Sequence, residues 1–175
     1  MGEKFPVDVA VQAPNGAFTL SEKLASGPVV VAFHRIWCPF CQQAARELSE
    51  MKQQLDVYSA QVVIVYREEI DVVSSSCAER GITCDCVSDA KRELEDATGL
   101  RRFSVGRYAA FSPRKLAGAL RSGSRVGKVK SGLLQGRGTF VVGTDGRIVY
   151  VHQARTAADI VPAADVLSAV RLLAG

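Results

Sequence analysis

Hydrophobic residues occur along the chain in two patterns, which predict alternating strands and helices. Two continuous, largely β-branched runs, VVVAF at 29–33 and QVVIVY at 61–66, are typical of strands buried on both faces of a sheet. From Pro39 the period changes, and one apolar stripe of a helix is formed by Ala44, Leu48, Met51 and Leu55. The first run is therefore predicted to be a central strand that leads directly into a helix.

Turn and cap residues delimit the weaker elements. Ser21 and Asp89 are predicted to begin helices, and Gly81 and Gly99 to end them. The expected short helices cover 22–26, 70–80, 91–98 and 113–120, and a further strand covers 84–88. The C-terminal part is predicted to begin with a hairpin of strands 139–143 and 147–152 that turns at Asp145-Gly146. A closing helix follows, and its apolar stripe consists of Ala163, Val166, Leu167, Val170 and Leu173.

This order predicts the fold class. A βαβ half followed by a ββα half implies an α/β protein with a central mixed β-sheet and helices on both faces. That is the thioredoxin-like three-layer arrangement. The length of 175 residues fits one domain over 1–175. The segment RIWCPFC at 35–41 then lies at the C-terminal end of the central strand, where open α/β sheets place ligands.

Cysteines supply the candidate chemistry. Their number is odd, so they cannot all pair within one chain: Cys38, Cys41, Cys77, Cys84 and Cys86. In a reducing cytosol, cysteines are expected to be catalytic, metal-binding or simply buried. The last three are expected to be small core residues, with Cys86 kept as a candidate extra redox partner. No metal is expected, because the C-x-C at 84–86 lacks the turn geometry of a zinc knuckle.

The C-x-x-C of Cys38 and Cys41 is interpreted as a redox pair, with a half metal site and two inert core thiols as alternatives. Free N–H groups and the helix dipole would stabilise a thiolate at Cys38, and Arg35 would add positive charge. Cys41 would then close the disulfide. Pro39 suits the first helical turn, and Trp37 is expected to be a wall of the site. This interpretation requires a Cys38 sulfur that solvent can reach, without a metal.

Charge and hydropathy limit the location and the partners that we expect for this protein. No apolar run could span a membrane and the start lacks a secretory signal, so a cytoplasmic location is expected. A basic excursion at 101–137 holds ten Lys or Arg residues and no acidic ones, against 12 basic and 18 acidic residues elsewhere. It is expected to be a solvated surface, with attraction of an acidic partner or substrate as the alternative. Nucleic acid is not expected, because no aromatic-rich stacking module accompanies it.

Three segments resemble a known group: PVVVAFHRIWCPFCQQAARELSEM, CVSDAKRELEDATGL and LLQGRGTFVVGTDGRIVYVHQARTAADIVP. They are similar to the alkyl hydroperoxide reductase/thiol-specific antioxidant superfamily, and more narrowly to its peroxiredoxin-like proteins with C-x-x-C. The resemblance implies a thioredoxin-like fold, Cys38 as the reactive thiol and Cys41 as its partner, with no cofactor. Val31 and Arg35 stand where typical peroxiredoxins carry Pro and Thr or Ser.

Where thioredoxins place a cis-proline, this chain has Gly138 and Thr139. The glycine is expected to let a substrate approach the backbone, and the threonine to hydrogen-bond near Cys38. His34 and His152 are given no role in proton transfer, since a thiolate of low pKa needs no base.

The leading hypothesis is a thiol-dependent oxidoreductase of the peroxiredoxin-like type, in which the Cys38 thiolate reduces peroxides and Cys41 resolves it. The first alternative is a thioredoxin-like enzyme acting on protein or small-molecule disulfides. The second is a non-catalytic redox sensor or binding protein that uses the basic excursion. The expected partners are a peroxide or disulfide and an external thiol or thioredoxin-like reductant, with a homodimer left open.

Overall fold

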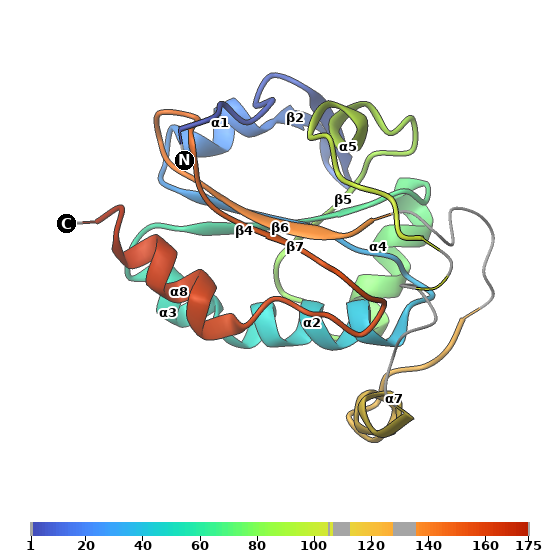
Figure 1. Ribbon diagram of the computed structural model, residues 1–175. Helices are drawn as coiled ribbons and strands as arrows, with labels where there is room; N and C mark the ends of the chain where they lie inside the picture. Colours follow the sequence, from blue (N-terminus) through green and yellow to red (C-terminus); the bar gives the residue numbers. More distant parts are fainter. Residues whose placement is uncertain (1, 105, 107–112, 128–135, 175) are drawn as a thin grey trace.

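One seven-stranded mixed sheet forms the middle of the molecule (Figure 1). The computed structural model describes residues 2–104, 106, 113–127 and 136–174. The strands lie in the order β2-β1-β5-β4-β3-β6-β7. Their bounds are β1 Ala10–Ala13, β2 Gly16–Thr19, β3 Val29–Phe33, β4 Gln61–Tyr66, β5 Asp85–Ser88, β6 Gly138–Val142 and β7 Ile148–Gln153. Because β3 pairs in parallel with β4 and antiparallel with β6, the run VVVAF is an inner strand, as predicted.

Helices cover both faces of the sheet, which confirms the predicted three-layer α/β fold (Figure 1). Their bounds are α1 Leu20–Leu24, α2 Pro39–Glu50, α3 Lys52–Asp56, α4 Ile70–Glu79, α5 Glu93–Ala97, α7 Pro113–Arg121 and α8 Ala163–Arg171. In Figure 1, α2, α3 and α8 lie below the sheet, α1 and α5 lie above it, and α7 lies beyond α2. Among the described helices, none is long and apolar enough to cross a membrane.

The residues of β3 supply both hydrophobic cores. Val30 and Ala32 belong to the cluster under α2, α4 and α8. Val29, Val31 and Phe33 belong to the cluster on the other face, with Leu20 of α1 and Leu94 of α5. All five side chains of β3 are fully buried. An uninterrupted apolar run is what a strand needs when neither face meets water.

Some element boundaries differ from the prediction. The first helix begins after Thr19, whose N–H donates to Glu22 Oε1, rather than after Ser21. The predicted stripe from Ala44 to Leu55 is divided at Met51 into α2 and α3, although its residues remain buried.

The fifth helix also begins later than predicted. Its first residue is Glu93, because Arg92 has a left-handed backbone with φ of 64°. Asp89 still accepts hydrogen bonds from the N–H groups of Leu94 and Glu95, as a capping carboxylate does.

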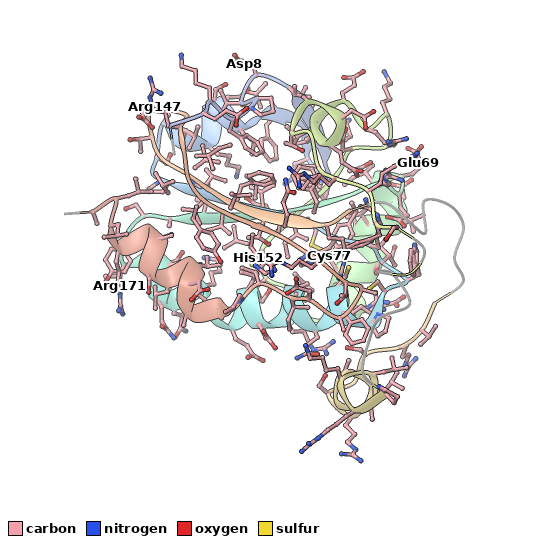
Figure 2. The ribbon with its side chains drawn as sticks, in the orientation of Figure 1. Asp8, Glu69, Cys77, Arg147, His152 and Arg171 are labelled. Carbon is pink, nitrogen blue, oxygen red and sulfur yellow. A yellow bond between two sulfur atoms is a disulfide. The ribbon has the colours of Figure 1, made fainter. Side chains whose placement is uncertain are left out.

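A disulfide between Cys77 and Cys86 joins α4 to β5. The expectation that these two are merely small core residues is therefore wrong. Cys77, labelled in Figure 2, comes from α4, and Cys86 comes from β5, an inner strand between β1 and β4. Cys84 remains a free thiol. Since Cys86 is bonded to Cys77, it does not complete a metal site with the C-x-x-C.

Candidate active site

The two thiols of the C-x-x-C lie where β3 gives way to α2. Cys38 is the N-cap residue of α2, with an extended backbone, and Pro39 is the first helical residue. Proline is suited to this position, because its missing N–H would have no acceptor within the helix. Cys41 follows in the first turn, and both cysteines are free thiols. The strand–helix junction therefore brings the predicted pair together.

Both sulfur-bearing residues are buried. Cys38 is 5 % exposed and Cys41 is 1 % exposed. They form a small apolar cluster with neighbours from the turn before α2, from α2 and α7, and from the segment after β7, namely Trp37, Phe40, Leu116, Ala119, Ala157, Ala158 and Ile160. The expectation of a solvent-open sulfur is wrong, because α7 and the segment at 157–158 cover the pair.

The cation at the thiols is Arg137. Its Nη1 donates to Cys41 Sγ at 3.1 Å and to Cys38 Sγ at 3.7 Å. Its Nη2 donates to the carbonyl oxygens of Thr156, at 3.1 Å, and Ala157. Four contacts from one guanidinium fix its plane against the sulfurs.

Strand pairing explains how this arginine reaches the site. It directly precedes β6, whose first residue, Gly138, pairs with Phe33 at the end of β3. Sequence reasoning missed Arg137 within the basic excursion. Its position next to the strand that opposes β3 was the signal that could have found it.

Arg35 does not play the predicted part. It is buried, and its Nη2 forms an ion pair with Glu95 Oε2 at 3.0 Å, while Arg67 binds the other oxygen of the same carboxylate at 2.7 Å. It also donates hydrogen bonds to the carbonyl oxygens of His34 and Gly136. The charge of Arg35 is thus held by Glu95, and Arg137 is the guanidinium that donates to the thiols.

The electrostatics of the pair also differ from the prediction. The pKa of Cys38 is raised, by its hydrogen bond with Cys41 and by burial. Burial would likewise raise the pKa of Cys41, but the hydrogen bond from Cys38 and the guanidinium of Arg137 outweigh it and lower that pKa. We expected the thiolate at Cys38, but the surroundings favour it at Cys41. The sulfur of Cys41 is 0.6 Å nearer to Arg137 Nη1 than the sulfur of Cys38 is.

Two histidines, His34 and His152, line a small pocket together with Arg137 and Thr139. Burial, with the charges of Arg137 and Arg35, lowers the pKa of His34 to about 4, so this imidazole is neutral at pH 7. His152, which Figure 2 shows between the sheet and α2, lies with its Nε2 3.3 Å from Asp159 Oδ1. A neutral His34 leaves Arg137 as the positive group at the sulfurs.

Gly138 and Thr139 lie in β6 beside the end of β3. A Cβ at Gly138 would lie 2.6 Å from Leu100 Cδ2, so neighbouring protein atoms already fill the space expected for a substrate. Thr139 is buried opposite Ala32, and within the described residues no hydrogen bond joins its side chain to Cys38. Nor do the described residues include a group of three or more His, Cys, Asp or Glu side chains that could hold a metal.

Comparisons with known proteins bear on the fold and on the family of the chain. No curated protein matches the chain in sequence. Among solved structures it is similar to a peroxidoxin, BcpB, of Mycobacterium tuberculosis, with 19 % identity, a TM-score of 0.73 and 99 % and 97 % of the two chains covered. A PrxQ variant of Xylella fastidiosa gives 20 % identity and a TM-score of 0.73, over 100 % and 97 %.

A third similar structure carries a different description. It is a putative thiol:disulfide interchange protein, DsbE, of Chlorobium tepidum, with 18 % identity, a TM-score of 0.68 and 99 % and 97 % covered. At such identities the three likenesses support the thioredoxin-like fold alone. The sequence model of the AhpC/TSA family, however, matches residues 1–151. The chain therefore belongs to the AhpC/TSA family.

Proposed function

We propose that Cys41 carries the thiolate with which this peroxidase-type thiol oxidoreductase reduces peroxides, and that Cys38 resolves it. The supporting observation is the position of Arg137, whose Nη1 is 3.1 Å from Cys41 Sγ and 3.7 Å from Cys38 Sγ. The thiolate is the nucleophilic form of cysteine, and a guanidinium beside it increases its population at neutral pH. This order reverses the one that the sequence favoured.

The proposed reaction has three steps. The Cys41 thiolate attacks the terminal oxygen of a hydroperoxide, the O–O bond breaks, and the departing alkoxide takes a proton to become an alcohol. Cys41 has then lost two electrons and become a sulfenic acid. The Cys38 thiol attacks this sulfur, an S–S bond forms, and the hydroxyl leaves with the Cys38 proton as water. An external dithiol reduces the disulfide and becomes oxidised itself.

Access to the sulfurs requires movement of their cover. Leu116 and Ala119 of α7, with Ala157 and Ala158, pack over the pair, and Cys41 is 1 % exposed. A peroxide can therefore reach Cys41 only when this cover separates from α2. The covered state shields the thiols from other oxidants between turnovers.

Single-cysteine variants test the assignment. We expect Cys38→Ser to react with one equivalent of peroxide and to accumulate a sulfenic acid at Cys41, detected by dimedone labelling and mass spectrometry. We expect Cys41→Ser to lose peroxide consumption by at least about a hundredfold, because covalent catalysis loses its nucleophile. Cys84→Ser is the matched control and should retain wild-type turnover with a dithiol.

The opposite labelling would overturn the assignment. If Cys41→Ser forms a sulfenic acid at Cys38 at the wild-type rate, then Cys38 attacks and Cys41 resolves. If neither single variant consumes peroxide and the wild type also fails with a dithiol present, the protein does not reduce peroxides under this mechanism.

A second candidate function is disulfide exchange on proteins or small disulfides. The reduced C-x-x-C favours it, as does the likeness to a structure titled a thiol:disulfide interchange protein. In that reaction, a variant that lacks the resolving thiol captures its substrate as a mixed disulfide. Capture of a disulfide-bearing protein by Cys38→Ser, with no faster peroxide loss in the wild type, would favour exchange over peroxide reduction.

The cellular location and the partners of the protein are part of the same proposal. An external thiol or thioredoxin-like reductant would return the C-x-x-C to its free-thiol form after each turnover. A cytoplasmic location stays a prediction, and the Cys77–Cys86 disulfide argues against it. A homodimer stays a prediction that sedimentation can check. The sensor alternative predicts that removing exposed charges of the basic excursion abolishes the cellular role while Cys41→Ser does not.

A further inference from the structure

The small pocket beside Arg137 contains two imidazole nitrogens that lack a hydrogen-bond partner. His34 Nδ1 and His152 Nε2 are both buried atoms, and no described residue forms a hydrogen bond with either of them. His152 Nε2 lies 3.3 Å from Asp159 Oδ1, but not at an angle that makes a hydrogen bond. An unpaired buried polar atom costs free energy, so two of them around one pocket indicate a bound polar molecule.

Strand pairing brings the two imidazoles to the same face of the sheet. Thr139 of β6 pairs with Ala32 of β3 on one side and with His152 of β7 on the other. His34 follows Ala32 by two residues, and its N–H continues the strand pairing by donating to the Val65 carbonyl oxygen at 2.9 Å. Paired residues, and residues two apart on a strand, have side chains on one face. His34, Thr139 and His152 therefore share the face that α2 covers.

The pocket has room for one water molecule. Its volume of about 10 Å³ corresponds to a single water-sized sphere. Besides the imidazoles, Thr139 and Arg137 contribute polar side chains to the lining, so a water finds the two to four partners that a buried water usually has. Arg137 is held in this wall, because the preceding residue, Gly136, packs so closely on Arg101 that a Cβ would collide with the Arg101 carbonyl oxygen.

The pocket lies between the reacting sulfur and solvent. Ala44, which is part of its lining, is about one turn after Cys41 on α2. Burial lowers the pKa of His34, and the largest effect of any charge on that pKa is the opposing one of Cys41, as expected of close neighbours. At the other end, the side chains of His152 and Asp159 are 21 % and 28 % exposed. The two histidines thus connect the surroundings of Cys41 with water.

The proposed reaction needs a proton at this place. A thiolate of low pKa needs no base, and for that reason neither histidine was expected from the sequence to transfer protons. The alkoxide that departs when the O–O bond breaks does need an acid, and Cys41 must end each turnover as a thiolate again. One proton therefore enters the site and one leaves it per turnover. A path that remains in place under the closed cover lets both transfers occur away from bulk water.

We propose that His34, one bound water and His152 form the path along which this proton moves. A neutral imidazole accepts a proton on one nitrogen while the other nitrogen releases one. In the peroxide step, His34 gives its N–H proton to the alkoxide, the water gives a proton to His34, and His152 passes one from solvent to the water. An alcohol is formed, and each group of the path regains the proton that it gave.

The same path serves the reduction step in the opposite direction. Of the two protons of the external dithiol, one stays on Cys38 as its thiol and the other leaves, because Cys41 ends as a thiolate. This inference rests on the proposed peroxide chemistry of Cys41 and names the residues that supply the proton for it.

Single-turnover kinetics test the path. Trp37 is the only tryptophan of the chain, and its fluorescence reports oxidation of the neighbouring thiols in stopped flow. We expect His34→Gln and His152→Leu to slow oxidation by tert-butyl hydroperoxide at least about tenfold, since general acids typically contribute more than that. Glutamine still hydrogen-bonds to water but passes no proton, so a slow His34→Gln separates proton transfer from positioning. Val161→Ala, in the same lining, is the matched control and should keep the wild-type rate.

Two further measurements respond to proton transfer itself. Imidazole in the buffer should restore part of the rate of His152→Ala, because that side chain is partly exposed, and should not change the rate of Val161→Ala. The second measurement needs no peroxide and follows protonation of the Cys41 thiolate at 240 nm after a rapid pH jump. We expect this relaxation to slow about tenfold or more in His34→Gln and His152→Leu. The equilibrium titration should be unchanged in His152→Leu.

Each result decides one proposal. If peroxide oxidation and thiolate protonation keep their wild-type rates in both histidine variants, the proton path is wrong and the peroxidase stands. If Val161→Ala slows both processes as much as the histidine variants do, the effect comes from packing and the path is again wrong. If the histidine variants slow thiolate protonation while the wild type consumes no peroxide, the path stands and the peroxide chemistry fails.

Discussion

At the scale of single residues, the hydrogen bond from Cys38 and the guanidinium of Arg137 both favour a thiolate at Cys41. One nitrogen of the guanidinium serves both Cys41 and Cys38, and the shorter contact goes to Cys41. The site is buried, so water screens this charge poorly and its effect on the pKa is large. Replacing the charge should therefore change the chemistry more than the fold.

The variant Arg137→Leu should raise the pKa of Cys41, since it removes the cation that favours the thiolate. As the thiolate then forms only at higher pH, peroxide reduction at pH 7 should fall about tenfold or more and recover in alkaline buffer. Thiolate absorbance at 240 nm against pH measures the shift directly. Arg137→Lys should restore part of the thiolate, and Arg171→Leu, at an exposed position, should not move the titration. An unchanged titration in Arg137→Leu would contradict the role given to this residue.

The sequence predicted the thiol pair but not its surroundings. Cys38 and Cys41 could be found because their spacing is local and they follow a buried strand. Arg137 could not be recognised in the same way, since it is 99 residues from Cys38 and comes from a segment with many other basic residues. Arg35 is adjacent in sequence, yet its side chain pairs with Glu95. Sequence proximity does not determine which side chain points at a sulfur.

At the scale of elements, the packing of α7 and the following segment against α2 controls access to the thiols. Gln42 of α2 is buried, and its side chain forms three hydrogen bonds, to the carbonyl oxygen of Ile36 and to both backbone groups of Arg125. Arg46, one turn later, donates to the hydroxyls of Ser122 and Ser124. These contacts tie the end of α7 to the helix that carries the cysteines.

Gln42→Leu should loosen this cover, because it removes all three hydrogen bonds that the buried Gln42 side chain makes to the backbone of Ile36 and Arg125. We expect the thiols to react several-fold faster with an aromatic disulfide reagent, and amide hydrogen exchange to increase in 113–127. Gln43→Leu is the matched control, since Gln43 bonds only to Glu47 within α2. Equal reaction rates in the two variants would show that Gln42 does not hold the cover.

The predicted elements were mostly found, while their ends depended on tertiary contacts. The inner strands and α4 could be predicted because their residue patterns are visible in a short stretch of sequence. The division of the long apolar stripe at Met51 and the delayed start of α5 at Glu93 have other origins. The left-handed backbone of Arg92 and the turn at Met51 depend on how the chain packs on the sheet. The spacing of apolar residues carries no information about that packing.

At the scale of the whole molecule, a disulfide joins the β4–β5 part of the sheet to a helix that covers it. Cys77 and Cys86 are nine residues apart, and both lie in the core cluster shared with α2 and α8. From the sequence we expected only that five cysteines could not all pair, and we took Cys77 and Cys86 for separate core residues, whereas the two form a disulfide. Their meeting depends on how α4 folds back along β5.

Removing this disulfide should destabilise the protein. For the double variant Cys77→Ala/Cys86→Ala we expect the free energy of unfolding to fall by about 2 to 3 kcal/mol, since the cross-link closes a short loop in the unfolded chain. Urea denaturation measures the change, with reduced wild type compared in parallel. The thiolate titration of Cys41 should be unchanged. A variant as stable as the oxidised wild type would show that this bond does not stabilise the fold.

The close packing of Gly136 on the carbonyl of Arg101 has a consequence for how the family can diversify. The two residues that flank the segment at 102–135 therefore touch each other, while its described part at 122–127 also bonds to α2 and to Trp37. Lengthening or trimming such a segment costs little closure entropy. A change in the length of this segment would thus alter which oxidants reach the thiols, while the junction of β3 and α2 that carries both cysteines keeps its sheet contacts.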